Sequence, residues 1–105
     1  MTTPPVACTL TPGEMHCQAA ELLPGLTARA ESGEWTEIGM ELRFIPTSAN
    51  LAAVTKAIDR ERECCAFLTF RLDVPAVHGE FVLAVSGPTG TREFLSELGL
   101  TLPTR

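Results

Sequence analysis

The sequence predicts a small single-domain α+β protein built on a three-stranded mixed sheet. Apolar and polar residues alternate over residues 35–45 and 70–74, which is the period of a strand, and residues 80–86 form a third short run that is almost wholly apolar. Apolar residues recur at three- and four-residue steps over residues 12–30 and 49–67, which is the period of an amphipathic helix. A chain of 105 residues has room for one core, so we expect one domain over residues 1–105, with loose tails at 1–7 and 101–105.

The first predicted helix spans residues 12–30. Thr11, Pro12 and Glu14 stand at the N-cap, N1 and N3 positions of a capping box. Pro24 predicts a kink or a break in this helix, because proline removes a backbone donor. The apolar stripe of the helix consists of Met15, Ala19, Leu22, Leu23 and Leu26.

The first predicted strand, residues 35–45, ends before Pro46, and Thr47 or Ser48 can cap the helix that follows. That second helix is expected over about residues 49–67. The inward residues of the strand are Ile38, Met40, Leu42 and Phe44. The apolar face of the helix consists of Leu51, Val54, Ile58, Cys65 and Leu68, and Glu61 fills the gap in this stripe.

Two more strands and a short helix complete the chain. The second strand places Phe70, Leu72 and Val74 on one side, and the third runs from Glu80 to Ser86. The third strand is apolar on both faces, which is typical of a central strand. The last helix turns Phe94, Leu95 and Leu98 inward and ends at Gly99 as its C′ residue.

These elements predict a split β-α-β arrangement, related to the ferredoxin-like plan but lacking its fourth strand. The third strand lies between the other two, the helices pack mainly on one face, and the N-terminal helix is an addition to the plan. Val82 and Ala84 make the other face partly apolar. We therefore expect that face to be covered by the first helix or by a second copy of the chain, as a homodimer.

Composition and charge exclude several classes of protein. The net charge of −5, with Arg60 and Arg62 offset by Glu61 and Glu63, argues against nucleic-acid binding. No apolar run approaches the length of a membrane span. The first residues lack the basic and apolar regions of a secretory signal, so we expect a cytoplasmic protein whose cysteines are reduced thiols or metal ligands.

The adjacent residues Cys64 and Cys65 form the most unusual stretch of the sequence. On a helix, Glu61 precedes them by three and four residues and lies on the same side. Thiolates at this spacing favour thiophilic ions such as Zn(II), Cu(I) and Hg(II), and Cys8 is the best candidate for a third thiolate. The candidate metal ligands are therefore Cys8, Cys64, Cys65 and Glu61. The alternative is that the cysteines are small apolar residues of the core.

Glu61 is a second anomaly, because it interrupts an apolar stripe. It could pair with Arg43, Arg71 or Arg92, bind a metal, or act as a base beside a thiol. A nearby carboxylate and a helix C-terminus both raise the pKa of a thiol. Nucleophilic catalysis therefore lacks an activator, and a bound cation is the simplest way to hold deprotonated thiols here.

The stretch Glu61-Arg62-Glu63-Cys64-Cys65-Ala66-Phe67 also carries a family resemblance. The chain resembles a family of small, largely uncharacterised bacterial proteins with a Glu-Arg-x-Cys-Cys-x-Phe motif, similar to C-terminal extensions of some metal-responsive regulators. The similar segments include Cys8-Thr9-Leu10, Leu42-Arg43-Phe44 and Ser86-Gly87-Pro88. The family often has proline after the cysteine pair, where this chain has Ala66. The resemblance implies metal or thiol sensing and carries over Cys8, Glu61, Cys64 and Cys65.

Three functions are consistent with these observations. The first is binding of a soft metal or a thiol-reactive ligand by the cysteine pair, in a sensor, a buffer or a resistance accessory protein. The second is an interaction or dimerisation domain with structural cysteines. The third and least favoured is a thiol-redox enzyme, because no histidine is placed beside the pair and adjacent cysteines form only a strained disulfide.

Overall fold

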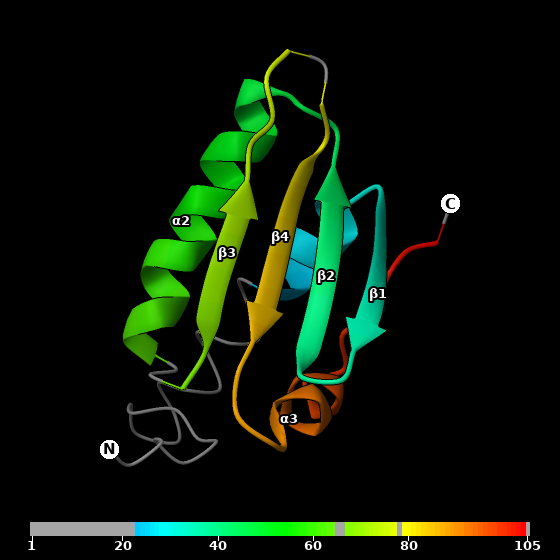
Figure 1. The fold of residues 1–105 in the computed structure, drawn as a ribbon, viewed down its shortest axis with the longest axis vertical. Coiled ribbons are helices and arrows are strands. Elements are labelled where there is room, and N and C mark those ends of the chain that lie inside the picture. Colours follow the sequence, from blue (N-terminus) through cyan, green and yellow to red (C-terminus); the bar gives the residue numbers. More distant parts are fainter. Residues whose placement is uncertain (1–22, 65–66, 78, 105) are drawn as a thin grey trace.

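The computed structural model describes residues 23–64, 67–77 and 79–104. Residues 23–29 are helical, which confirms the C-terminal end of the first predicted helix; its earlier part lies outside the described residues. The helical residues are followed by a four-stranded sheet in the order β1-β2-β4-β3, with the connections shown in Figure 1. Within the described residues, no helix combines the length and apolar character needed to cross a membrane.

The predicted strand over residues 35–45 is a hairpin of two strands. β1 (Ser32–Thr36) and β2 (Gly39–Phe44) pair antiparallel and are joined by a turn at Glu37 and Ile38. The predicted inward positions Met40, Leu42 and Phe44 are buried, but Ile38 is exposed because it lies in the turn. The apolar Ile38 continues the alternation of β2 by coincidence, which hid the turn in the sequence pattern.

The sheet is antiparallel throughout, so the predicted three-stranded mixed sheet is wrong. β4 (Phe81–Ser86) pairs antiparallel with β2 on one side and with β3 (Thr69–Asp73) on the other. β4 is therefore central, and the order β2-β4-β3 is the order predicted for these three strands. The strand that the sequence pattern did not predict is β1. The relation to the ferredoxin-like plan stays a prediction.

Helix α2 (Ser48–Cys64) connects β2 to β3. Thr47 caps it, because the Asn50 amide N–H donates to Thr47 Oγ1 over 3.1 Å. Asn50 is itself buried: its Nδ2 donates to the Ile45 carbonyl, and its Oδ1 accepts a hydrogen bond from Arg29. This side chain therefore ties the end of β2 and the helical residues 23–29 to the start of α2. The described part of α2 ends at Cys64; residues 65 and 66 lie outside the described residues, and Phe67, the predicted end of the helix, lies in a turn.

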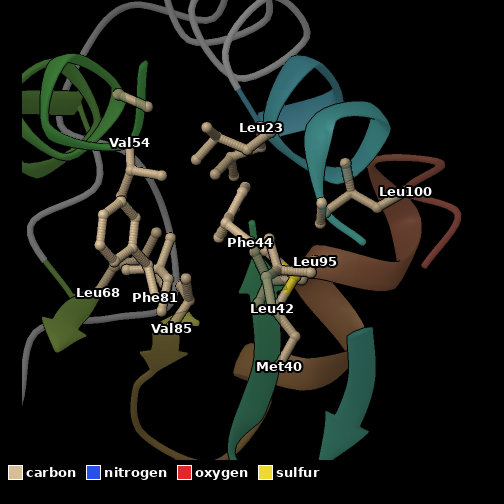
Figure 2. Close-up of a cluster of buried hydrophobic side chains, with 14 of the residues drawn as sticks. Leu23, Met40, Leu42, Phe44, Val54, Leu68, Phe81, Val85, Leu95 and Leu100 are labelled. Atoms are coloured by element: carbon tan, nitrogen blue, oxygen red, sulfur yellow. The ribbon is translucent and has the colours of Figure 1, made fainter. Parts of the chain in front are cut away.

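The core lies between one face of the sheet and the helices. Leu42 and Leu83 from the two central strands are fully buried, as are Leu23, Val54 and Leu95 from the three helical segments. Figure 2 labels four of these side chains, Leu23, Leu42, Val54 and Leu95, and shows them converging from helices and a strand on a single cluster. In β3, Phe70 and Leu72 pack against this cluster, whereas Val74 lies beyond the strand and is exposed, contrary to its predicted inward position.

The C-terminal part of the chain packs against the hairpin end of the sheet. Helix α3 (Thr91–Glu97) is followed by Gly99, whose φ of +79° confirms the predicted C′ position. Leu100 is buried and Leu102 packs on the core. The Gly33 amide N–H donates to the Pro103 carbonyl over 2.8 Å, so residues 101–104, expected as a loose tail, are attached to the outer edge of β1.

Candidate functional site

The C-terminal end of α2 positions the part of the candidate site that the structure describes. Glu61 lies one helical turn before Cys64, with which α2 ends. Cys8 and Cys65 lie outside the described residues, as does the side chain of Cys64. The structure therefore places Glu61 one turn from the backbone of Cys64. That the three thiols lie close together stays a prediction.

Glu61 is the most unusual buried side chain of the described chain. Its exposed fraction is 0 %, which confirms that its side chain faces the core, as the helical pattern predicted. Within the described part of the protein, neither Oε1 nor Oε2 has a hydrogen-bond partner. A buried carboxylate without a partner is strongly unfavourable in its charged form. Such groups in native proteins call for an explanation, and a bound ion is one of the few available.

Two of the three arginine partners suggested by the sequence, Arg43 and Arg71, are engaged elsewhere, and the third, Arg92, is exposed on α3. Arg43 contacts Glu41 at 2.8 Å and Glu34 at 3.6 Å, and Arg71 contacts Asp73 at 3.7 Å. Alternation along the strands places both arginines on the sheet face opposite the core, whereas Glu61 is buried in the core. The predicted ion pair of Glu61 with Arg43 or Arg71 is therefore wrong.

Burial also changes the acidity of this carboxyl group. Loss of hydration raises the pKa of Glu61 from 4.5 to about 7, and the positive charge of Arg60 offsets part of that rise. At neutral pH the group consequently exists in both protonation states. A cation placed near the carboxylate would hold it ionised, because an opposite charge favours the charged form.

The groups described at this end of α2 would favour a cation over an anion. The partial negative charge of a helix C-terminus attracts cations, and Cys64 is the last described residue of α2. A carboxylate oxygen together with thiolate sulfurs is a ligand set that Zn(II) accepts. In the described residues alone, no three acidic, cysteine or histidine side chains come together as a complete metal site. A complete site needs the sulfurs of the cysteine pair.

The sheet face that the helices leave open carries a group of charged side chains. Glu34, Glu41, Arg43, Arg71 and Asp73 share the sheet face that the helices leave open. Their common location depends on strand register and on β1, neither of which the sequence pattern specified. The sequence signal for this surface is the set of charged residues that alternate with apolar residues along the strands.

Comparison of the chain with protein-family models, with characterised proteins and with solved structures finds no significant match. The family resemblance inferred from the cysteine motif therefore stays a prediction. The functional argument depends on the chemistry of the residues themselves.

Proposed function

We propose that this protein binds a thiophilic metal ion through Cys64, Cys65 and the Glu61 carboxylate, with Cys8 as a further thiolate. The observation that carries the proposal is the fully buried Glu61 carboxylate, which has no hydrogen-bond partner in the described residues and lies one turn before Cys64. A cation bound there would neutralise a charge that otherwise has no compensation. The same cation would favour deprotonation of the neighbouring thiols.

The donor set limits which ions are suitable. Two or three thiolates select Zn(II), Cu(I) and Hg(II) over hard cations such as Mg(II) and Ca(II). Zn(II) also accepts carboxylate oxygen, whereas Cu(I) prefers sulfur alone. Participation of Glu61 therefore favours Zn(II) among these ions, and a site that ignores Glu61 favours the softer ones.

A site of this kind suits a sensor, a buffer or a resistance accessory protein. Metal binding releases thiol protons and stabilises the folded form. In the described residues, Glu61 and Cys64 lie in the last turn of α2, before the connection that leads into β3. Binding of the ion would therefore change the α2–β3 connection. We expect a partner to recognise that change.

The test is native mass spectrometry of the reduced protein with Zn(II), Cu(I) and Hg(II) offered in turn. We expect one ion per chain, lost in the variant Cys64→Ser/Cys65→Ser. Cys17→Ser is the matched control, because Cys17 is the remaining cysteine of the four and is not one of the proposed ligands. Retention of stoichiometric binding in the double variant would show that the proposed site is wrong.

The Glu61→Gln variant tests the contribution of the carboxylate to metal binding separately from that of the thiols. The variant keeps the size and polarity of the side chain but cannot carry charge. We expect Zn(II) affinity, measured by competition with a chelator, to fall by about tenfold or more, within the range seen when metal-site contacts are removed. An unchanged affinity would mean that the sulfurs bind the ion without Glu61.

A further inference from the structure

The open face of the sheet carries a regular pattern of charge. In one cross-strand row Arg43 of β2 lies beside Val82 of β4, and Val82 lies beside Asp73 of β3. The next row along the strands holds Glu41, Ala84 and Arg71 in the same three strands. Each row thus has opposite charges at its two ends, and the order of the charges reverses from one row to the next.

This face is accessible in the described chain. Figure 1 shows the helical residues 23–29 behind β2 and β4, so the strands present their other face to the viewer. Arg71 and Asp73 have side-chain exposures of 78 % and 60 %, and Val82 and Ala84 are half-buried between the charged columns. A shallow apolar strip therefore runs along β4 with charged side chains on both sides.

We propose that two copies of this chain associate face to face through this open sheet surface. Alternating charge makes the surface complementary to itself in both aligned packings of two sheets. With the two-fold axis along β4, Arg71 of one copy faces Glu41 of the other, and Arg43 faces Asp73. With the axis across the strands, Arg71 faces Asp73 and Arg43 faces Glu41. At the centre, Val82 and Ala84 each meet their own counterpart when the axis lies along β4, and Val82 meets Ala84 when the axis crosses the strands.

The charge pattern also indicates how strong this association is. Four strands at about 4.8 Å spacing, with about three outward residues each, cover only about 20 Å by 17 Å. Stable interfaces bury about 800 Å² on each partner, so this one belongs to the weak class. Its affinity is expected to depend on ionic strength, because exposed charges are screened within about 10 Å at 0.1 M salt.

The first test is sedimentation equilibrium of the wild-type chain at up to about 1 mM protein, in about 50 mM and about 500 mM NaCl. We expect reversible dimers that weaken as the salt concentration rises. Arg71→Glu should raise the dimer dissociation constant at least about tenfold, because it places like charges opposite each other in either packing. Lys56→Glu changes the net charge equally on the exposed side of α2 and should leave the constant within about twofold.

Mixing charge-reversed chains then identifies the packing. Arg71→Glu mixed with Glu41→Arg should form heterodimers if the axis lies along β4, whereas Arg71→Glu mixed with Asp73→Arg should do so if it crosses the strands. Circular dichroism confirms that each variant is folded before mixing. Rescue by one mixture supports the proposal. A wild-type chain that is monomeric at the highest concentration, or the failure of both mixtures, would overturn it.

Discussion

Replacement of Glu61 by glutamine gives the sharpest test of how the buried carboxylate affects folding. In the unfolded chain the Glu61 carboxyl loses its proton near its ordinary pKa of 4.5, whereas in the folded chain burial raises that pKa to about 7. Between these values the folded state binds more protons than the unfolded state. Stability must therefore fall as the pH rises through this range, because the proton has to be removed in a dry environment.

The size of the effect follows from the two pKa values. A rise from 4.5 to about 7 corresponds to about 3 kcal/mol, since each tenfold change in an equilibrium constant is about 1.4 kcal/mol. Below about pH 4 the group is protonated in both states and adds no pH-dependent term. Above about pH 8 the full penalty is present. The Glu61→Gln variant has no such term at any pH.

The assay is urea unfolding from pH 4 to pH 8.5, followed by the fluorescence of Trp35, the single tryptophan. The protein is kept reduced and free of metal. Subtracting the free energy of unfolding of Glu61→Gln from that of the wild type cancels the titration of all other groups. We expect this difference to fall by about 3 kcal/mol across the range. A flat profile of the difference would refute the reasoning.

The same experiment with Zn(II) present connects stability to the proposed site. A ligand at about 100 times its dissociation constant stabilises the folded state by about 2.7 kcal/mol. Zn(II) bound to the Glu61 carboxylate should therefore offset most of the penalty above pH 7. If Zn(II) stabilises wild type and Glu61→Gln equally, the carboxylate is not a ligand.

Three other substitutions test the packing, each by the change in the free energy of unfolding. Leu83→Ala removes a fully buried side chain from the central strand β4 and should destabilise by about 2–5 kcal/mol; a loss below about 1 kcal/mol would contradict the described core. Gly39→Ala would place a Cβ against the backbone oxygen of Val85 and should destabilise by about 1–3 kcal/mol; unchanged stability would contradict this close approach of β2 and β4. Thr47→Ala removes the cap of α2 and should lower stability by about 1 kcal/mol, whereas Thr47→Ser should restore most of that loss.

The sequence predicted those elements whose apolar period is uninterrupted. Met40, Leu42 and Phe44 lie inward as expected, and so do Phe81, Leu83 and Val85. The β1–β2 hairpin escaped prediction because Ile38, in its turn, keeps the period of β2. The pairing of Trp35 with Met40 reveals that the chain reverses direction at this turn. Strand pairing is a tertiary property that the apolar period does not contain.

The candidate site was also predictable in part from the period of its apolar residues. Helical spacing alone identified Glu61 as a core-facing carboxylate, and its burial confirms this. The absence of an ion-pair partner among the described residues was not predictable, since it depends on Arg43 and Arg71 lying on the opposite face of the sheet. Whether the cysteine sulfurs complete the site stays a prediction.

The hydrogen bond from Gly33 to Pro103 has a consequence for how the protein behaves in concentrated solution. Residues 101–104 occupy the outer side of β1, where an exposed strand would otherwise template the addition of another chain. Proline has no amide hydrogen to offer a further strand, so this added segment does not itself extend the sheet. Removing these residues would leave β1 as a bare edge. A chain shortened to end at residue 100 should therefore aggregate more readily than the full chain, even where the core is unchanged.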